Sequence, residues 1–214
     1  MSEHLLRFDE PSHTYWLGDR QVPGTTTVLG LLGGYEGIPA RILQKAATRG
    51  TAVHKITELE DAGTLDYATL DDELSGYLEA WWRFKDDHKP QILDAEVPGY
   101  HPTLLYAGTR DRRLALKKKA GILDIKSSYR LMPSTGPQTA AYKEIYNANV
   151  PKSEQLKHRW GLKLARDGTY ELKEYTDHAG DFNTFVSALN CWRFIEKHNA
   201  KLQTAIEEMT RELD

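Results

Sequence analysis

Apolar residues recur at helical spacing in two long segments of the N-terminal part of the chain. The first, IPARILQKAATRGTAVHKITELEDAG (38–63), predicts a helix that begins near Pro39 and ends at Gly63. The second, LDDELSGYLEAWWRFKDDHKP (70–90), predicts a helix that Pro90 ends, because proline cannot continue the backbone hydrogen-bond ladder.

Two shorter elements precede these helices. The segment HTYWLGDRQVPG (13–24) predicts a small hairpin with Gly18-Asp19 at its turn. The segment GTTTVLGLL (24–32) predicts a short helix with a threonine as its N-cap. With the two long helices, they are expected to form a hairpin and helical N-terminal arm over residues 1–90.

Beyond the arm, the pattern changes from helical spacing to that of strands. Three segments read as strands, namely ILDAEVPGY (92–100), TLLYAGTRDRRLAL (103–116) and ILDIKSS (122–128). The sequence KKKAG lies between the second and the third and predicts a turn. These two strands are therefore expected to pair with each other.

The remaining segments alternate helix, hairpin and helix. STGPQTAAYKEIYNANV predicts a helix after Pro137, LKHRWGLKLARDGTYELKEY predicts a hairpin that turns at Asp167-Gly168, and a long helix follows from about Asp181. This order predicts an α/β (α+β) fold, in which a central mixed, mostly antiparallel sheet over residues 91–214 is flanked by helices. Residues 1–214 are expected to form a single domain.

Composition narrows the classes of protein that fit. The chain has 214 residues and one cysteine, Cys191, which excludes an internal disulfide, a cysteine-based zinc site and a protein-ligated iron–sulfur cluster. No apolar run approaches the ~20 residues of a membrane span, and the N-terminus MSEHLLRFDEPSH lacks the pattern of a signal peptide. We therefore expect a cytoplasmic protein without a membrane partner. The net charge of −3 does not indicate a nucleic-acid partner.

Candidate chemistry lies in the segment GILDIKSS. Asp124 and Lys126 are two residues apart on a predicted strand, so their side chains point to the same face. Asp111 lies on the preceding strand, and pairing of the two strands would bring both carboxylates to one edge of the sheet. Two carboxylates and a backbone carbonyl make a site that Mg²⁺ or Mn²⁺ prefers. A nearby lysine could stabilise charge during phosphodiester cleavage, although alternating charges are also typical of an exposed strand face.

Four segments in order resemble the RecB-like branch of the PD-(D/E)XK nuclease superfamily, over residues 49–142. They are RGTAVHKITE with Gly50 and His54, YAGTRDR with Gly108 and Asp111, GILDIKSS with Asp124 and Lys126, and QTAAY with Gln138 and Tyr142. The resemblance implies a restriction-endonuclease-like core. The string VPGTTTV also resembles a segment that precedes this core in small phage and mitochondrial exonucleases.

The resemblance implies a metal centre. Asp111, Asp124 and the backbone carbonyl of Ile125 would bind the ion, and His54 would be a further ligand from the N-terminal helix. Glu96 on the first core strand matches an acidic position that completes the metal shell or orients a water molecule. Taken alone, His54 could instead pair with Glu58 on the helix surface, because the two are four residues apart.

The resemblance also implies roles in catalysis and DNA binding. Lys126 would assist the attacking water, and Gln138 and Tyr142 would position the DNA strand. Cations flanking the proposed site could guide DNA, or could guard a strand edge against unwanted pairing. They are Arg110, Arg112, Arg113, Lys117, Lys118 and Lys119.

Trp81 and Trp82 could stack on bases. At least one of them is expected in the core, because adjacent helical residues point about 100° apart.

The function expected from these features is that of a Mg²⁺- or Mn²⁺-dependent DNA exonuclease acting on DNA ends or single strands. It would serve recombination, replication or repair, in a phage-infected or bacterial cell, with a single-strand-binding or annealing protein as a possible partner. The alternatives are a structure-specific endonuclease and an inactive DNA-binding protein with a nuclease fold. The single cysteine argues against the iron–sulfur subgroup of the branch.

Overall fold

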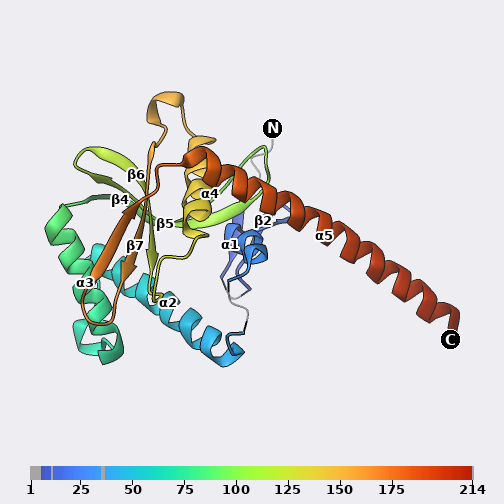
Figure 1. The fold of residues 1–214 in the computed structure, drawn as a ribbon, viewed down its shortest axis with the longest axis horizontal. Coiled ribbons are helices and arrows are strands. Elements are labelled where there is room, and N and C mark those ends of the chain that lie inside the picture. The colour runs from blue at the N-terminus through green and yellow to red at the C-terminus, as the bar shows by residue number, and fades with distance from the viewer. Residues whose placement is uncertain (1–5, 11, 35–36, 214) are drawn as a thin grey trace.

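The computed structural model describes residues 6–10, 12–34 and 37–213 and contains two β-sheets and five α-helices in that part of the chain (Figure 1). The strands are β1 (Leu6–Asp9), β2 (Thr14–Leu17), β3 (Arg20–Val22), β4 (Gln91–Tyr100), β5 (Ala107–Leu116), β6 (Lys119–Lys126), β7 (His158–Leu164) and β8 (Tyr170–Glu174). The α-helices are α1 (Thr25–Leu29), α2 (Ala40–Asp61), α3 (Asp72–His88), α4 (Thr135–Asn147) and α5 (His178–Leu213). Short 3₁₀ helices are Gly30–Leu32, Tyr67–Thr69 and Lys152–Glu154.

The larger sheet has five strands in the order β4-β5-β6-β7-β8. Neighbouring strands are antiparallel except β6 and β7, which run parallel and are joined through helix α4. A parallel pair needs such a crossover, because a tight turn can only join antiparallel strands. The predicted fold class, a mixed sheet flanked by helices, is confirmed.

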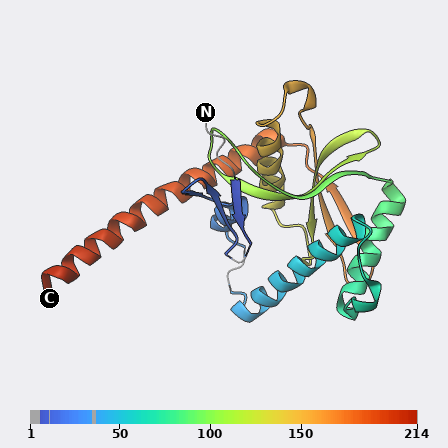
Figure 2. The ribbon, with the colours of Figure 1, turned by 180° about the vertical axis from the view of Figure 1, so that it is seen from behind.

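Alternate residues of β6 divide the core into two layers. Leu123 and Ile125 pack against helices α2 and α3, whereas Ile122 packs on the other side against α1, α4 and the first part of α5. This follows from the period of two along a strand. Figure 1 and Figure 2 show the helices on both faces of the sheet and the remainder of α5 extending away from the body.

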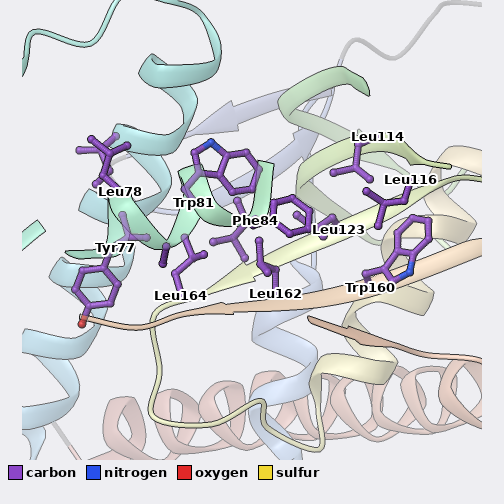
Figure 3. Close-up of a cluster of buried hydrophobic side chains, with 14 residues drawn as sticks. Tyr77, Leu78, Trp81, Phe84, Leu114, Leu116, Leu123, Trp160, Leu162 and Leu164 are labelled. Carbon is purple, nitrogen blue, oxygen red and sulfur yellow. The ribbon is translucent and has the colours of Figure 1, made fainter. Parts of the chain in front are cut away.

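The core on the α3 side is built around aromatic and leucine side chains (Figure 3). Trp81 and Phe84 stack with ring centroids 5.3 Å apart and lie above leucines of β5, β6 and β7. Trp81 is fully buried and the neighbouring Trp82 is 37% exposed, which confirms that one of this pair is a core residue. None of the described helices is long and apolar enough to cross a membrane.

Most of the predicted helix ends agree with the structure, whereas β5 begins at Ala107 instead of Thr103 and β6 spans Lys119–Lys126 instead of 122–128. The N-cap of α1 is Gly24, without a side-chain cap, so the predicted threonine cap is wrong. Helix α4 begins at Thr135, before Pro137, because a proline in the first helical turn forfeits no hydrogen bond. The turn at Gly18-Asp19 and the start of α2 after Pro39 are as expected.

Candidate active site

One cavity gathers side chains from the N-terminal sheet, α2, the central sheet and α4. Its volume is about 370 Å³, and it contains six of the residues expected at the site. They are His54, Glu96, Asp111, Lys126, Gln138 and Tyr142. Residues separated by more than eighty positions therefore line a single space, and they come from all four of the sequence segments.

His54, Glu96 and Asp111 form a compact group, in which one ligand atom of each residue lies within 4.8 Å of the others. Nδ1 of His54 is 3.3 Å from Oε1 of Glu96 and 3.6 Å from Oδ1 of Asp111. Nε2 of the same ring is 3.0 Å from the carbonyl oxygen of Ile125, to which it can donate. This contact orients the ring and leaves Nδ1 facing the two carboxylates, an arrangement typical of metal-binding histidines.

Asp111 joins this group to the strand that carries Asp124. Oδ2 of Asp111 accepts a hydrogen bond of 2.6 Å from the backbone N–H of Ile125, while Oδ1 faces His54. Asp124 is fully buried, and its Oδ2 lies 2.8 Å from Nζ of Lys126. The predicted pairing of Asp124 and Lys126 on one face of β6 is therefore present. Asp124 itself lies outside the compact group, so its role as a metal ligand stays a prediction.

The glutamate of the group has an unusual backbone. Glu96 lies on β4 with φ of 50°, in the left-handed region that residues with a side chain rarely adopt. Strain of this kind persists where the surrounding structure holds it, and it is frequent at functional sites. Here it accompanies a side chain that contacts both His54 and Arg112.

Burial and like charge shift the pKa values of these acids upward. Burial raises the pKa of Asp124 to about 6; Lys126 opposes this shift and the nearby Asp111 adds to it. Burial also raises the pKa of Asp111, against the lowering effect of His54. Burial lowers the pKa of His54, but Asp111 and Glu96 outweigh it and bring that pKa to about 9. The two carboxylates of the group thus favour the protonated, positively charged form of His54.

The donor set fits a divalent cation. Oδ1 of Asp124 is buried and accepts no hydrogen bond from any described residue, which is costly for a carboxylate oxygen unless a cation lies beside it. An imidazole nitrogen and several carboxylate oxygens suit Mn²⁺, and the oxygens alone suit Mg²⁺. The expected contribution of the Ile125 carbonyl stays a prediction, because that oxygen faces His54.

Two glycines border the site for different reasons. A Cβ on Gly108 would lie 2.6 Å from the ring of Tyr142, so only glycine lets α4 pack this closely on β5. A Cβ on Gly50 would meet nothing nearer than the hydroxyl of Ser127, at 3.8 Å. Packing therefore does not require glycine in the middle of α2, and its bare surface faces the cavity.

Gln138 and Tyr142 take the places expected of them on α4. Nε2 of Gln138 donates to the Tyr142 hydroxyl at 3.0 Å, and both side chains line the cavity. The alternative pairing of His54 with Glu58 is not formed. Glu58 binds Lys55 instead, at 2.9 Å on the helix surface.

The expected DNA contact of Arg112 is wrong, because its side chain is fully buried. Arg112 donates to Asp61 at 2.8 Å, to Glu96 at 3.1 Å and to Thr57 at 3.1 Å. It also donates to the carbonyl of Asp111 at 2.7 Å. Arg112 therefore holds Glu96 and the backbone of Asp111 in place through hydrogen bonds from the protein interior. This role was not predicted from the sequence.

The other cations of the basic segment also lie differently from expectation. Arg110 and Arg113 both bind Asp94 and both lie over the ring of Tyr146. The exposed Lys117 and Lys118 form the β5–β6 turn and the exposed Lys119 begins β6, at the end of this strand opposite Asp124. Lys118 is six positions before Asp124 in extended chain, a distance of about 20 Å. This turn therefore does not flank the cavity, and a role for it in DNA binding remains a prediction.

A larger cavity of about 550 Å³ lies between α2 and the start of α3. None of the predicted site residues lines it; four cations do, namely Arg41, Lys45, Arg49 and Arg166. This cavity was not predicted from the sequence, because its lining combines residues of 41–52 and 71–77 with the distant Arg166, and Arg49 and Ala52 are the lining residues that lie within one of the four segments. It contains no histidine and no member of the compact acidic group.

Comparisons with known proteins give no family assignment. No family model and no curated protein matches the chain. Among solved structures, the chain is similar to an alkaline exonuclease (LHK-Exo) from Laribacter hongkongensis, with 14% identity, a TM-score of 0.39 and 82% of each chain covered. LHK-Exo in complex with dAMP gives 14% identity and a TM-score of 0.34, over 85% of this chain and 94% of that one. Likeness at this level assigns neither family nor activity.

Proposed function

We propose that this protein is a metal-dependent nuclease that hydrolyses phosphodiester bonds in DNA, and that it acts as an exonuclease on ends or single strands. The observation that carries the proposal is the convergence of His54, Glu96 and Asp111 in one cavity with Lys126. These side chains come from α2, β4, β5 and β6, so no local sequence effect explains their meeting. The four-segment resemblance supports placement in the RecB-like branch.

The residues of the cavity would have different roles, namely metal binding, charge stabilisation and orientation of the DNA strand. His54, Glu96 and Asp111 would hold Mg²⁺ or Mn²⁺, with Asp124 close by. When bound, the cation supplies Lewis acidity at the phosphate. Lys126, held 2.8 Å from Asp124, offsets the negative charge that develops on the phosphate oxygens. Gln138 and Tyr142 present polar groups on the α4 side that can orient the strand.

The substrate follows from the same chemistry. A phosphodiester is cleaved so slowly without catalysis that an enzyme must lower the barrier by roughly 20 kcal/mol. A cation together with a positioned lysine is suited to this task. The sequence VPGTTTV supports an exonuclease of the phage type that works in recombination, replication or repair. A single-strand-binding or annealing protein would be its natural partner.

A gel assay tests the proposal. Linear and circular DNA, each single- and double-stranded, would be incubated with Mg²⁺, with Mn²⁺ or with EDTA. We expect metal-dependent loss of linear DNA while circles remain intact. Cleavage of circles would instead identify an endonuclease, and absence of cleavage on every substrate would refute the nuclease proposal.

Matched variants link any cleavage to the cavity. Asp111→Asn is expected to abolish cleavage, because it removes a charge from the compact group. Asp94→Asn makes the same change on β4 at a residue that pairs with Arg110 and Arg113 outside the cavity, and it should retain activity. Equal activity of the two variants would show that the assigned site is wrong.

A further inference from the structure

The cavity has a second wall that the proposed chemistry does not use. Phe8 of β1, Tyr15 of β2 and His13 between them line it from the N-terminal sheet. The rings of Phe8 and Tyr15 stack with centroids 4.7 Å apart, and His13 meets Phe8 edge-on at 5.2 Å. Three aromatic rings thus lie together on the side of the cavity formed by the small sheet.

The strand register explains why these rings share a face. Phe8 and Tyr15 are direct partners in the antiparallel pair of β1 and β2, so their side chains emerge on the same side. Tyr15 is buried, and its hydroxyl lies 3.0 Å from Oγ1 of Thr109 on β5. This contact fixes the small sheet against the central one, with Phe8 and His13 at the cavity. Trp16, the next residue, points to the opposite face and packs under Arg7.

His13 is held at the rim by its backbone. Its φ of 51° lies in the left-handed region, which costs free energy for a residue with a side chain. The side chain is exposed, so core packing does not explain the residue's presence. Glu10 lies on the same wall and would repel a phosphate. A ligand phosphate is therefore expected on the side of Lys126. The aromatic side of the cavity then suits a flat, apolar part of the same ligand.

A nucleotide unit has this division, with a charged phosphate at one end and a flat base at the other. The cavity volume of about 370 Å³ lies at the small end of the range for ligand pockets, roughly 300–1,000 Å³. We propose that Phe8 forms a stacking platform for one unpaired nucleobase beside the scissile phosphate, and that His13, whose ring is perpendicular to that of Phe8, contacts the edge of this base. The strand is therefore single at the point of cleavage. This inference rests on the proposed nuclease function and adds the substrate class.

Abasic substrates test the platform. A single-stranded oligonucleotide would be compared with one of equal length that carries abasic residues in place of its bases. Binding would be measured by fluorescence anisotropy in EDTA, and kcat/KM for cleavage would be measured in Mn²⁺. The proteins are the parent, Phe8→Leu, His13→Gly and the control Trp16→Leu. His13→Gly removes the ring, and glycine adopts the left-handed backbone of this position without strain. This variant is therefore expected to fold, and it tests the platform even if Phe8→Leu unfolds the protein.

We expect the parent to favour the base-bearing oligonucleotide, in binding and in kcat/KM, by at least the effect of stacking one base, about five- to 150-fold. Phe8→Leu and His13→Gly should lose most of this preference, and Trp16→Leu should keep it. The platform is refuted if both cavity variants discriminate as well as the parent, or if Trp16→Leu loses as much. If the parent cuts no DNA, the nuclease proposal fails, while the binding comparison still decides the platform.

Discussion

The buried Arg112 gives the sharpest quantitative prediction. Its guanidinium is fully buried and contacts the carboxylates of Asp61 and Glu96, at 2.8 and 3.1 Å. Arg112→Met would remove the nearer of the two cations that contact the Asp61 carboxylate, which is 6% exposed, and would leave only Lys85 at 3.4 Å. Breaking a buried ion pair in this way costs about 3–5 kcal/mol, because the remaining charge stays desolvated.

The assay is thermal unfolding, with Arg113→Met as the matched control. For a chain of this length, each kcal/mol changes Tm by about 2–4 °C, so Arg112→Met should lower Tm by roughly 6–20 °C. Arg113 is 27% exposed and binds Asp94 at the surface, where an ion pair is worth only about 0–1 kcal/mol. Equal Tm values for the two variants would refute the role of Arg112 as a buried support.

Three further predictions concern the cavity itself. Gly50→Ala should stabilise the fold by about 0.5–1 kcal/mol in urea unfolding, because alanine is the better helix former. The same variant should lower kcat/KM, because the added methyl group enters the cavity. A drop in stability would show that packing requires this glycine. The pKa of Asp124 is raised to about 6, so the metal-free protein should lose stability as pH rises from about 4 to 6. The pKa of His54 is raised to about 9, so a further loss is expected between pH 6.5 and 9. Tm measured in EDTA should fall across both ranges, and a rise would contradict the assigned environments. Mn²⁺ at a hundred times its Kd should raise the free energy of unfolding by about 2.7 kcal/mol, an effect that Glu96→Gln should reduce and that calorimetry would detect.

Local periodicity was sufficient to predict much of this molecule. Alternation along β6 placed Asp124 and Lys126 on one face, and the structure has them 2.8 Å apart. Helical spacing placed Gln138 beside Tyr142, with a hydrogen bond of 3.0 Å. Turn residues and prolines located most of the element ends. These features depend on neighbours within a few residues, so the chain specifies them before any long-range contact forms.

Tertiary packing alone decided which strand residues are buried and which lie near the cavity. Arg112 lies in the run of cations that suggested a DNA-binding surface, yet it faces Trp81 and is buried. Which face of β5 a helix covers depends on α3, more than twenty residues earlier, and not on the run itself. Lysines 117–119 were expected near the site, but the length of β6 carries them about 20 Å from Asp124.

The two walls of the cavity also differ in what the sequence indicated and what only the tertiary structure decided. The resemblance brought together His54, Glu96 and Asp111, but the contact of the Ile125 carbonyl with His54 and the left-handed backbone of Glu96 depend on how α2 and β4 pack on the central sheet. Nothing in the N-terminal hairpin alone indicates that Phe8 faces these acids. That placement arises from Tyr15 docking on Thr109, ninety-four residues away in sequence, and such long-range pairing is set by the packing of the whole fold.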